Sequence, residues 1–216
     1  MNNAGTVQWG AFEFTPVDLW KQQFDVNFFG HVSITHRAVP YVRRAKGRII
    51  FISTIGGQVG SPMTGPYCAS KFALEAAADS FRRELHPFGA KVSVVEPGGT
   101  ATRMLDVLRT TADDAVARVA GDGAETYRRI GSGLIAAPEQ FRGMATAPEK
   151  VVEAICHALF SRRPKIRHRV GLDAKLLLSL NAVVPDRVMD FVLRKIMKLL
   201  PWFHLNIEEK TFREGE

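Results

Sequence analysis

Apolar residues recur along this chain in two patterns, and each pattern predicts a different element. Spacings of three or four predict amphipathic helices over residues 16–45 and 67–88. Two buried-type runs, GRIIFIS at 47–53 and AKVSVVEPGG at 90–99, predict strands that are covered on both faces. A proline followed by a glutamate predicts the start of a further helix over 148–161. Strands that alternate with helices predict an α/β domain with a parallel sheet.

The rest of the chain is less regular. Residues 103–147 are mixed and loop-like, with helical pieces at 113–119 and 125–130. A short strand is predicted near 166–171, and two more helical stretches follow within 173–200. No repeat, low-complexity segment or linker divides the sequence, so we expect a single domain.

The composition limits the class of protein. Apolar residues make up 46% and charged residues 24%, as in an ordinary soluble globular protein. No apolar leader follows Met1, and the longest apolar stretch, at 176–184, is shorter than the ~20 residues that cross a bilayer. We therefore expect a cytoplasmic chain that spans no membrane. Cys68 and Cys156 lack metal-ligand spacing, so we expect reduced, structural thiols and no metal site.

The net charge of +7 raises the question of a polyanionic partner. The basic residues are scattered in ones and twos, without a zinc-finger, RNA-recognition or homeodomain pattern. We therefore expect no nucleic-acid partner. A basic face near an anionic dinucleotide or a membrane surface explains the charge as well.

Tyr67 and Lys71 lie four residues apart at the start of a predicted helix, so their side chains share one face. A free tyrosine, with a pKa of about 10, is a poor proton shuttle at neutral pH. An ammonium group beside it favours the phenolate and lowers that pKa, which makes Tyr67 a candidate general acid or base. The alternative is that a tyrosine and a lysine meet at this spacing by chance.

Hydroxyl groups stand where the predicted strand 47–53 ends, at Ser53 and Thr54. Ligands of α/β proteins bind at the carboxyl ends of parallel strands, and a hydroxyl there can donate to a substrate oxygen. More often such hydroxyls satisfy backbone groups. Asn27, inside the first predicted helix, is a poor helix former that usually bonds locally, and alone it indicates little.

Together these residues resemble the short-chain dehydrogenase/reductase family. NNAG at 2–5 looks like its structural motif, Asn27 like its helix asparagine, and Tyr67 with Lys71 like its catalytic pair. PGGTAT at 97–102 looks like its Pro-Gly turn, followed by a threonine near the nicotinamide. YCASKFALE and HPFGAKVSVVEPGG are similar to the hydroxysteroid and retinol dehydrogenase branch.

This resemblance implies a Rossmann-like, doubly wound parallel sheet and an NAD- or NADP-dependent oxidoreductase. Tyr67 would exchange the hydroxyl proton of the substrate, and Lys71 would lower the Tyr67 pKa while bonding the nicotinamide ribose. Asn27 would hold a water in a proton relay to Lys71. The cofactor-binding residues that the resemblance implies are Asn3, Ala4, Gly5, Tyr67, Lys71, Pro97, Gly98, Thr100 and Thr102.

The chain departs from the family at its catalytic serine. That serine is expected thirteen positions before the tyrosine, where this chain has Thr54. Threonine keeps the hydroxyl, but its methyl group stiffens χ1 and crowds the carbonyl, so we expect reduced polarisation. Ser53 is the alternative, although it would point off the opposite face of the strand.

A second departure concerns the family's phosphate-cradling glycine loop, which belongs before NNAG. The string GSGLIA at 131–136 has a similar shape but follows a helical segment, so we reject it. We expect one partial domain over 1–216 that lacks the first βαβ units. The residues that select NAD or NADP would lie in the absent part, so the choice between them is open.

A truncated domain has an alternative reading and a physical consequence. The alternative is a catalytically inactive remnant that acts through oligomerisation or partner binding, by way of the helices over 16–45 and 67–88. The consequence is that the strand at 47–53 would expose a long apolar edge. We therefore expect a homo-oligomer or a poorly stable chain.

Within the implied domain, residues 1–102 form the catalytic core, 103–147 the substrate lid, and 148–200 the C-terminal helices and last strand. The apolar lid residues suit a lipophilic alcohol or ketone, or they pack on the core; they are Met104, Leu105, Leu108, Leu134, Ile135, Phe141 and Met144. The basic amphipathic segment 186–203 can lie on a membrane surface, or it packs on its own domain or on a second subunit.

Overall fold

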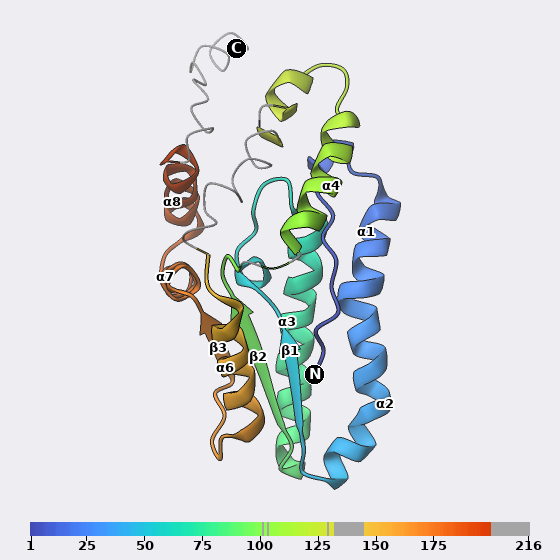
Figure 1. Cartoon of the computed structure of the whole chain (residues 1–216), viewed down its shortest axis with the longest axis vertical. Coiled ribbons are helices and arrows are strands. Elements are labelled where there is room, and N and C mark those ends of the chain that lie inside the picture. The colour runs from blue at the N-terminus through green and yellow to red at the C-terminus, as the bar shows by residue number, and fades with distance from the viewer. Residues whose placement is uncertain (101, 103, 129, 132–144, 200–216) are drawn as a thin grey trace.

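Helices cover a small parallel sheet in the computed structural model, which describes residues 1–199 except 101, 103, 129 and 132–144 (Figure 1). The strands are β1 (Arg48–Ile52), β2 (Lys91–Pro97) and β3 (Arg167–Val170). The helices are α1 (Val17–Phe24), α2 (Gly30–Arg44), α3 (Gly65–Leu85), α4 (Met104–Ala117), α6 (Pro148–Phe160), α7 (Leu172–Asn181) and α8 (Asp186–Leu199). None of the described helices is long and apolar enough to cross a membrane.

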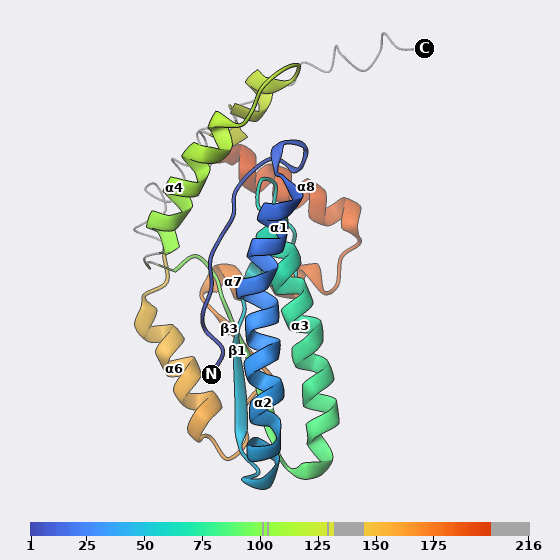
Figure 2. The ribbon, with the colours of Figure 1, turned by 90° about the vertical axis from the view of Figure 1, so that its right-hand side faces the viewer.

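The sheet confirms the predicted α/β architecture. Its strands are all parallel, in the order β1-β2-β3, with Arg48 beside Lys91 and Val94 beside Arg167. Figure 2 shows helices on both sides, with α6 on one face and α1, α2 and α3 on the other. Both faces of the strands are therefore buried, which is why the two strand sequences show runs of β-branched residues in place of alternation.

Each face of the sheet has its own apolar core. On one side Leu74, Ala78 and Leu85 of α3 pack against the face of β1 that carries Ile49 and Phe51. On the other side the core is formed by Ile50, Val95, Ala158 and Val170, with Val151 and Ile155 of α6 packed against it. The two cores hold the strands of the sheet in place, and the functional groups stand at the ends of these strands.

The predicted helix over 16–45 is present, but its buried stripe is polar. It runs through α1, a π-helical segment (Asp25–Phe29) and α2 without a break. Ile34 is one of the apolar residues that this spacing would bury, but it is 65% exposed. The fully buried positions, four apart, are instead Gln23, Asn27, His31 and Thr35.

The polar stripe binds the extended N-terminal segment, which lies between α1–α2 and the sheet (Figure 1). Gln23 accepts from the amide of Gln8 at 2.7 Å and donates to the carbonyl of Thr6 at 2.8 Å. Further along, His31 Nε2 lies 2.8 Å from the Ala4 carbonyl oxygen. The stripe is polar because a single extended segment needs partners for backbone groups that no neighbouring strand satisfies.

The same segment covers part of the β1 edge. The Asn2 amide donates to the carbonyl of Ile50 at 2.8 Å, and the Ile52 amide donates to the carbonyl of Asn2 at 2.9 Å. The Asn2 side chain also donates to Thr35 at 3.0 Å. The edge of β1 is thus paired at its carboxyl end, so the expectation of a long uncovered edge was too broad.

Replacing Gln23 by leucine should destabilise the protein by about 2 kcal/mol, because the Thr6 carbonyl and the Gln8 amide would lose their partners. Urea unfolding followed by circular dichroism measures the loss. Gln22→Leu is the matched control, since Gln22 is the exposed neighbour on the same helix. Equal unfolding midpoints for the two variants would show that the stripe does not hold the segment.

The segment over 103–147 is more helical than the sequence suggested. Helix α4 begins at Met104, so the loop expected before residue 113 is largely wrong. Ala112 and Ala115 are buried against Val7 and Trp9, and this tertiary contact stabilises the helix. The second expected piece is helical over 124–128.

Candidate functional site

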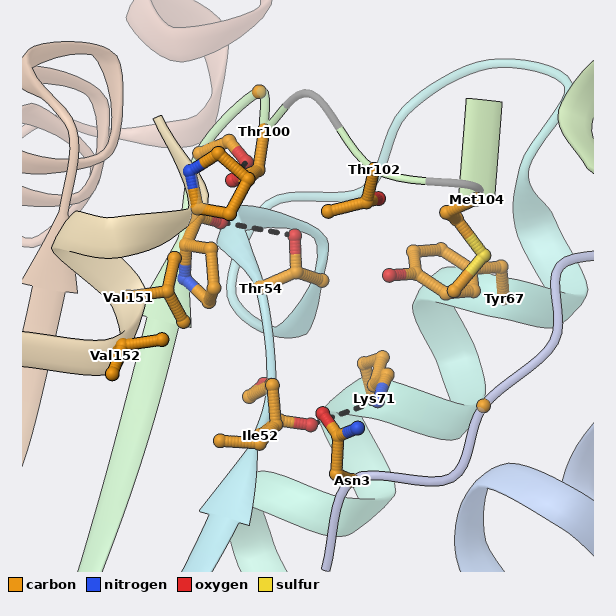
Figure 3. A pocket seen from close by; sticks show the side chains of 16 residues that line it. Asn3, Ile52, Thr54, Tyr67, Lys71, Thr100, Thr102, Met104, Val151 and Val152 are labelled. Carbon is orange, nitrogen blue, oxygen red and sulfur yellow. Dashed lines mark hydrogen bonds between the residues drawn. The ribbon is translucent and has the colours of Figure 1, made fainter. Parts of the chain in front are cut away.

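A cavity of about 420 Å³ opens where β1 and β2 end (Figure 3). Its wall comes from the N-terminal segment, both strand ends, the start of α3, the turn after β2 and the start of α6. The lining residues are Asn3, Gly5, Ile52, Ser53, Thr54, Tyr67, Lys71, Pro97, Gly98, Gly99, Thr100, Thr102, Met104, Pro148, Val151 and Val152. Among the residues expected to bind a cofactor, all except Ala4 lie in this wall.

Tyr67 and Lys71 reach the cavity from the first turns of α3. The helix begins at Gly65 and Pro66, and proline is well tolerated there because the first amides of a helix have no intrahelical acceptor. The Tyr67 hydroxyl points into the cavity (Figure 3). Lys71 is 4% exposed, and its Nζ donates to the carbonyl of Ile52 at 2.9 Å.

Burial moves the pKa of each member of this pair away from its ordinary value. Burial lowers the pKa of Lys71 to about 8, although the nearby Glu75 carboxylate raises it. Burial raises the pKa of Tyr67 to about 12, although a hydrogen bond with Thr54 lowers it. The expected lowering of the Tyr67 pKa is therefore not found, because burial outweighs the favourable contacts.

The hydroxyls at the end of β1 lie in different surroundings. Thr54 projects into the cavity near Tyr67 and donates to the carbonyl of Pro97 at 3.2 Å (Figure 3). Ser53 is buried, and its hydroxyl faces the Glu75 carboxyl. This contact lowers the pKa of Glu75, but burial of the Glu75 carboxyl raises that pKa by more. Both residues line the cavity, but the Ser53 hydroxyl faces Glu75 whereas the Thr54 hydroxyl stands near Tyr67.

Asn27 is the expected catalytic residue that the structure does not bring into the cavity wall. It is fully buried in the π-helical segment. Its amide group accepts from the Thr6 amide at 2.9 Å and donates to the Thr6 carbonyl at 3.0 Å, and it also lies 3.3 Å from Ser70 Oγ. These contacts place Asn27 behind Gly5, where it orients the backbone that lines the cavity. Its part in a water relay to Lys71 stays a prediction.

The turn after β2 is held by a residue that sequence reasoning missed. The Asp173 carboxylate accepts from the amide of Gly99 at 2.8 Å. A Cβ on Gly98 would overlap this carboxylate, so the glycine lets Asp173 approach the turn this closely. Asp173 belongs to the first turn of α7, 74 positions from Gly99 in the sequence, and no local pattern indicates the contact.

Sequence reasoning also missed two larger features of the site. One is the side of the cavity formed by α6, and the other is a charged cluster behind Lys71. Val151 and Val152 come from the apolar positions of α6, a signal that the sequence did contain. The cluster centres on Arg167, which pairs with Glu75, with Glu96 at 2.7 Å, and with Asp79 at 3.2 Å. It links the helix that carries Lys71 to β2 and β3.

The lid residues are only partly described. Met104 lines the cavity, as expected of a lid residue. The side chains of Leu105 and Leu108 lie outside the described part of the chain, as do Leu134, Ile135, Phe141 and Met144 and most of the string at 131–136. Among the described residues, no group of three or more His, Cys, Asp or Glu side chains is placed to hold a metal ion.

Comparison with known proteins finds a matching family model and several similar proteins. The family model described as short chain dehydrogenase matches residues 1–113. The uncharacterized oxidoreductase YbbO of Escherichia coli is 34% identical over 194 residues, which cover 89% of this chain and 65% of the relative. Short-chain dehydrogenase/reductase family 9C member 7 of Bos taurus is 36% identical over 204 residues, which cover 91% and 64%.

A solved structure extends the likeness to three dimensions. The crystal structure of a short-chain dehydrogenase from Streptomyces avermitilis matches with a TM-score of 0.65 at 28% identity. The match covers 91% of this chain and 68% of that structure. The chain spans 65% and 64% of the length of the two curated relatives.

Proposed function

The chain belongs to the short-chain dehydrogenase/reductase family, and we propose on that basis that it is an NAD- or NADP-dependent oxidoreductase that interconverts an alcohol with a ketone or aldehyde. The observation that carries the proposal is the cavity at the strand ends, where Tyr67, Lys71 and Thr54 come together. Their hydroxyl and ammonium groups are those that a proton transfer to or from a substrate oxygen requires.

The cavity wall fits the nicotinamide half of a dinucleotide. Gly98 and Gly99 have no side chains, so a ligand can approach the backbone of this wall closely. The hydroxyls of Thr100 and Thr102 stand beside it. Lys71 and Asn3 offer hydrogen-bond donors that suit a ribose on the opposite side. When bound, the dinucleotide supplies or accepts the hydride. NAD and NADP both remain in the proposal.

The proton chemistry follows from the state of Tyr67. Its pKa, raised by burial to about 12, keeps the hydroxyl protonated at neutral pH, which is the form that gives a proton to a carbonyl being reduced. Thr54 would donate a second hydrogen bond to the same oxygen as negative charge develops on it. In the oxidation direction Tyr67 would take the hydroxyl proton of the substrate.

The substrate side of the proposal is a lipophilic alcohol or ketone. Ile52, Met104, Val151 and Val152 give the cavity an apolar wall beside its few polar groups. Cavities of this kind bind largely apolar ligands and use the polar groups to orient them.

Titration of the 216-residue chain with NADH and with NADPH, followed by nicotinamide fluorescence, tests the proposal. We expect saturable binding of at least one of them and oxidation of the bound form when a lipophilic ketone is added. A folded sample that binds neither dinucleotide would contradict the proposed function.

A homo-oligomer is part of the proposal. The outer faces of the helices on one side of the sheet expose Phe29, Ile34 and Tyr41, and Phe72 of α3 is 44% exposed. Exposed apolar faces of this kind often pack on a second copy. A monomer by light scattering at micromolar concentration would contradict it.

The inactive-remnant alternative loses support, because the chain keeps Tyr67 and Lys71 in one cavity.

A cytoplasmic location with peripheral membrane contact completes the proposal. Met189 and Leu193 of α8 pack on the domain, while Val188 and Phe191 are 44% and 56% exposed beside Arg187. Exposed apolar and basic side chains on one helix suit an anionic bilayer surface. Equal co-sedimentation with anionic vesicles after deletion of residues 186–216 would exclude this helix as the contact.

A further inference from the structure

Helix α6, β3 and α7 lie together at one edge of the sheet (Figure 1). A second cavity, of about 510 Å³, is lined by residues of these elements. We call it the β3 hollow. Its lining residues are Lys150, Glu153, Ala154, His157, Lys165, Arg167, His168, Arg169, Val170, Gly171 and Lys175. It shares no lining residue with the cavity of Tyr67, so the proposed function does not account for it.

The side chains around the β3 hollow are mostly basic. Lys150, Lys165 and Lys175 are exposed, and none of them forms an ion pair with another described residue. Glu153 is the one carboxylate among the described residues of the wall. Three ammonium groups against one carboxylate leave this cavity with a net positive charge.

The guanidinium groups of β3 do not contribute to that charge. Arg167 reaches the opposite face of the sheet, where it pairs with Glu96 at 2.7 Å. Arg169 reaches the same face and lies 3.7 Å from the other oxygen of Glu96. Among the described lining residues, the unpaired positive charge of the β3 hollow therefore comes from the lysines.

His168 adds an unpartnered polar atom to the wall. It is 7% exposed, and its Nε2 has no hydrogen-bond partner among the described residues. Burial lowers its pKa, and the neighbouring His157 and Lys165 lower it further. His157 lies against it, with ring centroids 5.1 Å apart. A buried polar nitrogen without a partner in the protein needs one from a water or a ligand.

The backbone of β3 supplies further donors. The carbonyl of Ile166, just before β3, accepts from the amide of Val94 at 2.8 Å, and that of Val170 accepts from the amide of Gly98, just after β2, at 2.9 Å. In a parallel ladder the alternate residues face the other way, so the amides of the lining residues 167 and 169 face the open edge. Within the described part of the chain, β3 pairs with β2 only.

We propose that the β3 hollow binds a phosphate group, which is either a free phosphate or the headgroup phosphate of an anionic lipid. Lysine ammonium groups and outward backbone amides are the donors that tetrahedral oxyanions prefer. The unpartnered nitrogen of His168 completes the set, since it can accept from a protonated phosphate oxygen or, when charged, donate to an unprotonated one.

The surface beside the β3 hollow decides between the two sources. Leu172 and Leu176 of α7 are 72% and 64% exposed and lie on either side of Lys175 in the sequence. These leucines would contact acyl chains if the phosphate belonged to a lipid, whereas a free phosphate would not need them.

Titration of the full chain with inorganic phosphate, followed by the amide and imidazole NMR signals of His168, tests the site. We expect saturable shifts with a millimolar dissociation constant. Lys165→Gln combined with Lys175→Gln should weaken binding about five-fold or more. Arg37→Gln combined with Arg44→Gln removes the same charge from exposed positions of α2 and should change it little. Unsaturable shifts, or equal weakening in both double variants, would overturn the proposal.

Vesicles of phosphatidylcholine with and without phosphatidic acid identify the source. Binding only to the acidic vesicles, reduced by the Lys165 and Lys175 substitutions and by Leu172→Ser with Leu176→Ser, would assign the site to lipid. Saturable phosphate binding without vesicle binding would assign it to a free phosphate. Both outcomes uphold the site and are independent of dinucleotide binding, which the cofactor titration measures separately.

Discussion

Tyr67→Phe should lower kcat/KM for carbonyl reduction by about 10³-fold or more, and leave dinucleotide affinity within about two-fold of wild type. The substitution removes only the hydroxyl that points into the cavity (Figure 3). Without it, the hydroxyls that remain among the described lining residues belong to serine and threonine, which are far weaker acids than a phenol. A proton would have to come from water, which is a weaker acid at this position than a positioned phenol.

Two measurements separate loss of chemistry from loss of structure in this variant. Nicotinamide fluorescence reports binding, and stopped-flow absorbance of the reduced dinucleotide reports the hydride step. Tyr41→Phe is the matched control, because Tyr41 is 66% exposed on α2 and far from the cavity wall. A Tyr67→Phe enzyme that keeps more than about a tenth of the wild-type rate would remove Tyr67 from the proposed role.

Lys71→Met should abolish turnover and at the same time raise the free energy of unfolding at neutral pH by on the order of 1–2 kcal/mol. The native state holds a charged lysine at 4% exposure, and burial lowers its pKa to about 8. A downward shift of this size costs on the order of 3 kcal/mol while the group stays charged. Loss of the hydrogen bond to the Ile52 carbonyl offsets part of the gain.

The pH dependence gives this second prediction a distinctive sign. Between the folded pKa of about 8 and the ordinary lysine value of 10.5, the unfolded state binds more protons than the native state. The free energy of unfolding of the wild type should therefore increase as the pH rises through this window, because Lys71 loses its charge more easily in the native state than in the unfolded state. The advantage of Lys71→Met should shrink from about pH 8 to about pH 10, as the native lysine loses its charge.

Urea unfolding of both proteins across this pH range measures the effect. Tyr67 is present in both, so the opposite trend from its raised pKa, which lowers stability between about pH 10 and pH 12, cancels in the comparison. Lys175→Met is the control, because that lysine is exposed on α7. A Lys71→Met protein that is less stable than wild type at every pH would show that the lysine is stabilised by contacts stronger than its burial cost.

Local sequence determined the elements of this protein and the chemistry that they carry. The spacing of apolar residues was sufficient for α3, β1 and β2, since burial on one face or on two imposes its period on the chain. The four-residue spacing of Tyr67 and Lys71 placed both in one cavity, because helix geometry alone puts them on one face. The glycines of the turn after β2 were also readable, as was the hydroxyl at the end of β1.

Tertiary structure alone decided what each polar group contacts. The buried stripe of Gln23 and His31, the carboxylate of Asp173 on Gly99, and the surroundings of Arg167 all join residues that are far apart in the sequence. The direction of the Tyr67 pKa shift belongs with them, since it depends on how much water the packed structure excludes. Periodicity fixes which face of an element is covered, but the partner of a buried hydrogen-bonding group depends on which distant segment covers that face.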